Sequence, residues 1–157
     1  MKKKTRKNSE EEQQYWLLKT EPGEWSWEDQ KANGGKSNWD GVNNKQAQKY
    51  LKSMKIGDLC FFYHSGTKFR RVVGVVTVVK ECYNDENGIA VDVEAVAEMR
   101  KQVDLAEMKT DQRLNESGFI LFRQPRLSVV PVSKVQWDLV CELGGGYDGD
   151  DGRVREE

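Results

Sequence analysis

The single histidine of the chain, His64, is the first side chain to consider for chemistry. A hydrolase would need a nucleophile beside it and a third group to orient it. Cys60 stands four residues earlier on the same strand face, but about 13 Å of extended chain would separate the two, which is too far for proton transfer. We therefore interpret His64 as a strand-end histidine that hydrogen-bonds locally, and a small hydrolase using His64 is the least favoured function.

Other catalytic or metal chemistry finds no support in the residue pattern. Cys60, Cys82 and Cys141 are odd in number and form no C-x-x-C arrangement, so they indicate reduced, mostly buried thiols rather than a zinc site or disulfide framework. The carboxylates lie in tails and on helix faces, and no glycine-rich run has phosphate-loop spacing. We expect no catalytic residue, no metal and no cofactor.

The five tryptophans point instead to recognition, because an indole offers a flat face on which a nucleobase can stack. Trp16 and Trp137 lie in a predicted strand and a predicted helix, where core packing is the simpler interpretation, and Trp27 is expected to anchor its helix to the sheet. Trp39 differs because it follows Ser37-Asn38 and precedes Asp40-Gly41, in a polar, turn-rich stretch. We interpret Trp39 as a stacking residue.

A second candidate segment is Lys19-Thr20-Glu21-Pro22, which directly follows a buried strand. Backbone and side-chain groups at such a strand end can donate to and accept from the edge of a base.

The elements that must position these residues are short strands mixed with helices. The strands are predicted where Val, Leu, Ile and aromatic residues cluster between turn formers: residues 15–19, 58–63, 72–79, 89–96 and 127–132. This order has no βαβ rhythm, so it predicts an α+β fold with a bent mixed sheet or pseudo-barrel of five to six strands flanked by helices.

Helix starts are indicated by capping residues. Ser26 with Asp29 near it, and Asn44, are expected to begin the first two helices, and Asp104 with Glu107 has capping-box spacing.

Apolar residues mark the second helix and the last helix. In the second helix, spacings of three and four join Ala47, Tyr50, Leu51 and Met54. Ser133 with Gln136 opens the last helix, which we expect to run through Val135, Leu139 and Leu143 and to end at Gly144.

The ends of the chain differ from its middle. Of 157 residues, we expect residues 14–145 to form one domain, 1–13 to be a disordered basic and acidic tail, and 146–157 to be a disordered acidic tail. The basic run from Lys2 to Lys7 suits a nuclear-import signal, a weak phosphate-binding arm or a solvated tail. With no apolar run near 20 residues, we expect an intracellular monomer without membrane contact, in the nucleus or otherwise in the cytoplasm.

Four separated motifs together resemble the EVE domain. They are residues 15–22 (YWLLKTEP), 39–44 (WDGVNN), 57–65 (GDLCFFYHS) and 126–132 (RLSVVPV). The resemblance covers nearly all of residues 14–143. It implies a PUA-like fold related to the YTH readers of methylated adenine, and a pocket of a kind associated with modified cytosine in DNA.

Carried over by position, the resemblance implies a base-binding pocket. Trp39 matches the stacking aromatic, and the pocket residues it implies are Trp39, Lys19, Thr20 and Glu21, with Asn43, His64 and Ser65 in adjoining motifs.

The chain departs from the family pattern in two places. Asn43, Lys45, Gln48 and Lys49 replace arginine, tyrosine, arginine and asparagine, so phosphate contacts would pass to Lys45 and Lys49. Only the short turn 84–88 stands where the family commonly has a longer loop, often with a tryptophan. Trp25 either replaces that missing wall or merely covers a helix end.

The favoured prediction is thus a non-catalytic reader that stacks a flipped, modified base, with modified cytosine in DNA ahead of RNA ligands. The alternative is a degenerate pocket in a protein-interaction or regulatory module.

Overall fold

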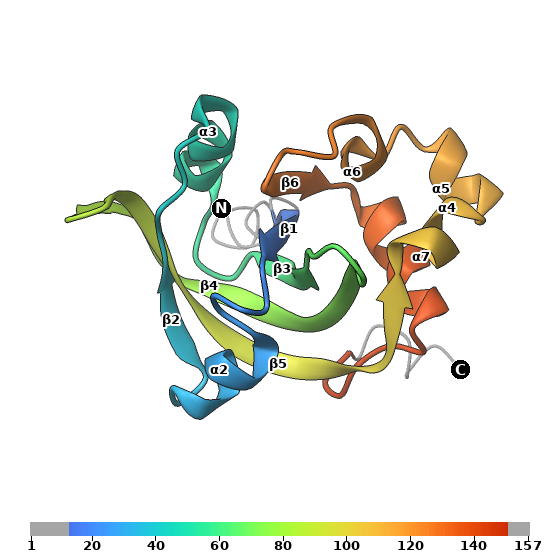
Figure 1. The fold of residues 1–157 in the computed structure, drawn as a ribbon, viewed down its shortest axis with the longest axis horizontal. Helices are drawn as coiled ribbons and strands as arrows, with labels where there is room; N and C mark the ends of the chain where they lie inside the picture. The colour runs from blue at the N-terminus through green and yellow to red at the C-terminus, as the bar shows by residue number, and fades with distance from the viewer. Residues whose placement is uncertain (1–12, 151–157) are drawn as a thin grey trace, which may run out of the picture.

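The computed structural model describes residues 13–150, which fold around one six-stranded mixed sheet (Figure 1). The strand order is β2-β5-β4-β3-β1-β6. The strands are β1 (Tyr15–Thr20), β2 (Lys36–Trp39), β3 (Leu59–His64), β4 (Arg71–Asp85), β5 (Gly88–Asp104) and β6 (Val129–Val132). Neighbours β1 and β3 are parallel, and the other pairs are antiparallel. The predicted α+β class and bent mixed sheet are confirmed.

Six helices flank this sheet in the described part of the chain. They are α2 (Trp27–Ala32), α3 (Lys45–Ser53), α4 (Leu105–Lys109), α5 (Gln112–Glu116), α6 (Ile120–Arg123) and α7 (Lys134–Leu143). The last four gather at one side of the sheet, whereas α2 and α3 lie apart from them and from each other (Figure 1).

The central strands are buried on both faces, which is why they read as continuous apolar runs. Residues 60–63 of β3 and 72–76 of β4 are all buried, as expected where both faces of a sheet are covered. Trp16 and Trp137 belong to this core, and so does the predicted α3 stripe through Ala47, Leu51 and Met54.

One strand was missed and two are longer than predicted. β2 consists of Lys36, Ser37, Asn38 and Trp39, whose polar composition gives no strand signal, and it is held by antiparallel pairing to β5 at the edge of the sheet. β4 and β5 form a long hairpin with several register shifts, and such irregularities bend a sheet.

Three of the four predicted caps are confirmed. Ser26 and Ser133 each form a full capping box, with Asp29 and Gln136 respectively, and the Asn44 side chain accepts from the Ala47 amide. Asp104 is at the predicted N-cap but makes no side-chain cap bond. Its carboxylate lies 2.9 Å from Arg71 Nε instead, because an ion pair across the hairpin competes with the cap.

Val135, Leu139 and Leu143, through which the last helix was expected to run, do not form the buried face of α7. Val135 is 63% exposed and Leu139 and Leu143 are only partly buried. The buried face carries Gln136, Trp137, Val140 and Cys141 instead, since the large indole of Trp137 stacks on Phe61 of β3 at 3.8 Å between ring centroids. The indole sets the rotation of the helix.

The ordered fold continues past the predicted boundary at residue 145. Tyr147 is 4% exposed and forms an isolated antiparallel bridge with Met99 of β5. Composition alone misplaced this boundary, because a single aromatic residue after three glycines secures the chain to the sheet. The basic run from Lys2 to Lys7 lies outside the described residues.

None of the three cysteines, all of which lie within residues 13–150, forms a disulfide; Cys60 and Cys141 are buried and Cys82 is partly exposed. Within residues 13–150, no helix is long and apolar enough to cross a membrane.

Candidate functional site

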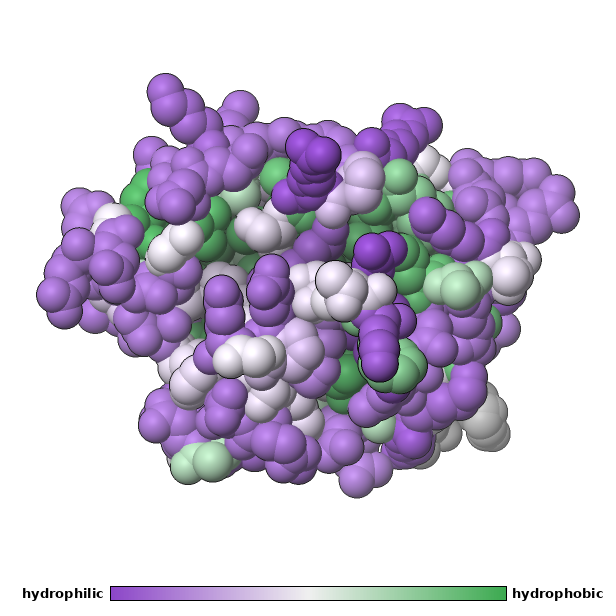
Figure 2. All heavy atoms as spheres, in the orientation of Figure 1, coloured by the Kyte–Doolittle hydropathy of each residue, from purple (hydrophilic) through white to green (hydrophobic). Residues whose placement is uncertain are grey.

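A cleft of about 760 Å³ opens where the parallel strands β1 and β3 end side by side. Its walls come from the segment after β1, the end of β2, the loop after β3, α4, α6 and the segment before β6. Small-molecule sites commonly span roughly 300–1,000 Å³, so the cleft has the size of a binding site. Hydrophilic side chains cover most of the face seen in Figure 2, with hydrophobic residues visible between them.

Lys19 and Tyr63 are directly paired across β1 and β3 and both line the cleft. Lys19 Nζ donates to the Pro125 carbonyl oxygen at 2.8 Å and lies 5.8 Å from the Tyr63 ring centroid. Burial, helped by the nearby Arg70 charge, lowers the pKa of Lys19 to about 8. Burial also raises the pKa of Tyr63 to about 12. The cleft therefore holds a neutral phenol beside an ammonium group that loses its charge at mildly alkaline pH.

Thr20 bonds both the segment after β1 and the segment after β3. Its hydroxyl donates to the Trp25 carbonyl oxygen at 2.8 Å, and its own carbonyl accepts from the Ser65 amide at 2.8 Å. The segments after β1 and β3 are thereby fixed relative to each other, which preorganises polar groups around the cleft.

Trp39 is the last residue of β2, and it both packs in the core and lines the cleft. Its ring meets Phe62 edge-on, with centroids 5.6 Å apart, and 8% of its surface is exposed. The indole is thus held by the core and presents a small part of its surface to the cleft, whereas the sequence suggested an aromatic on a polar loop.

Gln30 of α2 positions two residues of the same wall. The side chain is fully buried, and its Oε1 accepts from Trp25 Nε1 and from the Ser37 hydroxyl, each at 2.8 Å. Its Nε2 donates to the Gly35 carbonyl oxygen at 2.8 Å. The Trp25 indole is bonded to α2 and also lines the cleft; that it replaces the missing wall stays a prediction.

The short β4–β5 turn braces the rim of the cleft. Asn87 Nδ2 donates to the Asp40 carboxylate at 3.1 Å, and Asn38 bonds both Asp40 and Asp85. Gln48, which stands in place of a family arginine, donates to the Val42 carbonyl oxygen at 2.8 Å. Gln48 and the short β4–β5 turn thus support the loop that carries Asn43.

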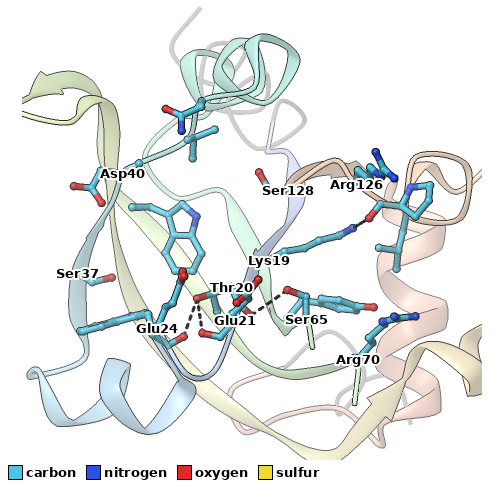
Figure 3. A pocket seen from close by; sticks show the side chains of 18 of the residues that line it. Lys19, Thr20, Glu21, Glu24, Ser37, Asp40, Ser65, Arg70, Arg126 and Ser128 are labelled. Atoms are coloured by element: carbon cyan, nitrogen blue, oxygen red, sulfur yellow. Dashed lines mark hydrogen bonds between the residues drawn. The ribbon is translucent and has the colours of Figure 1, made fainter. Parts of the chain in front are cut away.

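Charge is divided across the cleft. Glu24 and Asp40 lie on the β2 side, whereas Arg70 and Arg126 lie on the opposite side, with Lys19 between (Figure 3). A ligand with hydrogen-bond donors at one end and negative charge at the other would match this arrangement.

Most of the predicted pocket residues come together here. Those lining the cleft are Lys19, Thr20, Glu21, Trp25, Trp39, Asn43 and Ser65. His64, Lys45 and Lys49 are not among the lining residues; Lys45 and Lys49 are exposed on α3.

The sequence reasoning missed Tyr63, Arg70, Lys109 and Arg126. Arg126 and Tyr63 lie within the motifs that carry the family resemblance, so those motifs were a signal for them. No sequence motif indicated Arg70 and Lys109, because 39 residues separate them in the chain.

His64 serves the fold. Its Nε2 accepts from the backbone amide of Trp27 at 3.0 Å, so its partner lies 37 residues away and the expected local bond was wrong. Burial, and then the Arg71 charge, lower the pKa of His64, which keeps the imidazole neutral as this acceptor role requires. No group of three or more His, Cys, Asp or Glu side chains suited to a metal ion occurs among residues 13–150.

Comparison with known proteins identifies the family. The EVE domain model matches residues 14–143. Human thymocyte nuclear protein 1 is 31% identical over 164 residues, covering 82% of this chain and 73% of that protein. The crystal structure of human THYN1 in complex with 5-methylcytosine-containing DNA superposes with a TM-score of 0.77 at 32% identity, covering 83% of this chain and 97% of that one.

A bacterial protein, Atu2648 from Agrobacterium tumefaciens, superposes with a TM-score of 0.79 at 39% identity, covering 87% of this chain and 97% of that one. The family model and the similar structures cover most of the chain, and the protein belongs to the EVE domain family.

Proposed function

We propose that the cleft receives a modified base extruded from a nucleic-acid strand, and that modified cytosine in DNA is its ligand. The observation that carries this proposal is the combination, in one cleft, of a core-held indole, an acidic wall and a basic wall. The 5-methylcytosine DNA bound by the human relative supports the choice of base.

Each wall has a chemical counterpart in a nucleotide. A base that stacks on Trp39 contributes roughly 1–3 kcal/mol of binding free energy. Carboxylates such as Glu21 and Asp40 accept hydrogen bonds from an exocyclic amino group, which cytosine and adenine have and thymine lacks. Lys19, Arg70 and Arg126 would attract the phosphates.

The proposed role is binding without catalysis. His64 is committed to the amide of Trp27 and does not line the cleft, so it supports no hydrolytic mechanism.

We also propose that the protein is nuclear, because of the basic run from Lys2 to Lys7 and the names of its relatives. A fluorescent fusion of the full chain that is excluded from nuclei would contradict this.

The test is binding of fluorescent single-stranded oligonucleotides that differ at one central base: cytosine, 5-methylcytosine, thymine or N6-methyladenine. We expect the 5-methylcytosine strand to bind best, and thymine to bind more weakly because it lacks the amino group. Trp39→Leu keeps an apolar side chain but removes the ring, and we expect it to weaken binding of the methylated strand by about fivefold or more.

Trp137→Leu is the matched control, because Trp137 is a buried tryptophan that stacks on Phe61 and does not line the cleft. It should lower stability and leave the preference among bases unchanged, with both variants assayed where circular dichroism shows them folded. Equal binding of all four strands, unaffected by Trp39→Leu, would refute the reader function and favour a protein-interaction module.

A further inference from the structure

A second hollow of about 490 Å³ adjoins the cleft and shares Arg70, Leu105 and Lys109 with it. We call it the side groove. Its remaining lining comes from the loop between β3 and β4 and from the start of α4: Thr67, Lys68, Phe69, Arg71, Asp104 and Ala106. The shared residues place the two hollows side by side, with Arg70, Leu105 and Lys109 at their boundary.

Positive charge dominates the side groove. The lining carries four cations and one carboxylate. The cations are Lys68, Arg70, Arg71 and Lys109, and the carboxylate is Asp104, which is already paired with Arg71 at 2.9 Å. The net charge of the whole chain is only −1, so this concentration is local. Such a basic track suits the phosphates of a strand.

Phe69 is the most exposed aromatic side chain among the described residues, with 58% of its surface open. An exposed aromatic ring beside cations can serve as a platform on which an unpaired base stacks. The Arg71 guanidinium lies 4.2 Å from its ring centroid, which orients the ring.

The loop is held at its base. Arg70 Nε donates to the Gly66 carbonyl oxygen at 3.0 Å, and the Arg70 carbonyl oxygen accepts from the Leu105 amide at 2.8 Å. The two bonds secure the loop to itself and to α4, so the ring and the cations are presented together.

We infer that the side groove binds the strand that flanks the base in the cleft: Lys68, Arg70 and Lys109 contact its phosphates and the neighbouring base stacks on Phe69. This inference rests on the proposed function and adds the path of the strand to it. It assigns phosphate binding to the β3–β4 loop rather than to Lys45 and Lys49 of α3. An acidic peptide would match the cations but would have no use for the exposed ring.

The experiment compares Phe69→Leu, Phe69→Trp and Lys68→Gln with the α3 variant Lys45→Gln/Lys49→Gln. Lys68 and Phe69 line the side groove and not the cleft. Each protein is titrated with single-stranded decamers carrying central cytosine or 5-methylcytosine, at several salt concentrations, and with the mononucleotide 5-methyl-dCMP, whose binding is followed by NMR.

We expect Phe69→Leu to weaken both decamers equally, by about fivefold or more, and Phe69→Trp to retain binding. Lys68→Gln should reduce the slope of log affinity against log salt by roughly 0.7, the value for one phosphate contact on a single strand. Binding of 5-methyl-dCMP, which has no flanking nucleotide, should be unchanged in all three groove variants.

The failures are distinguishable. If Phe69→Leu and Lys68→Gln bind the decamers as the unaltered protein does, or if only the α3 variant loses affinity, the side groove is not the strand path, and a retained preference for 5-methylcytosine leaves the proposed function standing. If the groove variants weaken both decamers but the unaltered protein shows no preference for 5-methylcytosine, the strand path holds and the reader function fails. Absence of binding to either decamer overturns both.

Discussion

Gln30 has no solvent-exposed surface, yet it controls two residues of the cleft. Its amide bonds Trp25, Ser37 and the Gly35 carbonyl oxygen at once. Leaving buried donors and acceptors without partners costs about 1–3 kcal/mol each. The three bonds of this side chain therefore stabilise α2 against β2. A glutamine in a six-residue helix gives no such signal in the sequence.

His64 makes the fold sensitive to acid. Its pKa in the folded chain is below the ordinary 6.5, because of burial and the Arg71 charge. Below about pH 6.5 the unfolded chain therefore binds more protons than the folded one, and the free energy of unfolding falls as the pH drops. We expect His64→Gln, which retains an acceptor for the Trp27 amide but does not titrate, to flatten this part of the stability profile.

Urea unfolding of both proteins at pH 7.5, 6.5 and 5.5 measures the effect. A mutant whose stability still declines in parallel with that of the unaltered protein would show that other groups cause the acid sensitivity.

Helix α2 is joined to the sheet by a close approach of one indole to a strand backbone. A Cβ atom placed on Gly74 of β4 would lie 2.6 Å from ring atoms of Trp27. The ring is buried and also packs edge-on against Phe62, so it has little freedom to move. The glycine is required here by packing, not by an unusual backbone conformation.

Gly74→Ala is therefore expected to destabilise the protein by about 1–3 kcal/mol, the usual cost of overpacking a core. Gly23→Ala is the control, because a Cβ there meets nothing within 4 Å. Combining Gly74→Ala with Trp27→Leu should cost less than the sum of the two single changes, since the smaller side chain relieves the clash. Strict additivity in urea unfolding would argue against this contact.

At the scale of the molecule, the chain closes on itself beyond the last helix. Gly144 ends α7 where a Cβ would lie 2.7 Å from the Met99 side chain. The backbone amides of Arg100 and Lys101 donate to the carbonyl oxygens of Gly146 and Gly144. Tyr147 then bridges to Met99. The C-terminal segment thus packs on the distal part of β5.

A chain ended after residue 145 is expected to be less stable than one ended after residue 150, on the order of 2 kcal/mol for the lost burial of Tyr147. Tyr147→Ala in the full chain should reproduce most of that loss. Equal melting temperatures for the two truncated chains would show that the bridge contributes nothing to stability.

Local patterns in the sequence were sufficient for most elements of the fold. The apolar runs around residues 15–19, 58–63 and 72–79 each became a strand, and Ser26, Asn44 and Ser133 capped their helices, because apolar runs and capping depend on neighbours within a few residues. The four family motifs also located β1, the Trp39 loop and the β3 end that together line the cleft.

Only the tertiary structure decided what depends on residues far apart in the chain. Pairing with β5 makes Lys36–Trp39 a strand, and a backbone amide 37 residues away occupies His64. Arg70 and Lys109 line the same cleft because the Leu105 amide, at the start of α4, donates to the Arg70 carbonyl oxygen in the β3–β4 loop. Such contacts arise from the packing of whole elements, so no local pattern in the sequence records them.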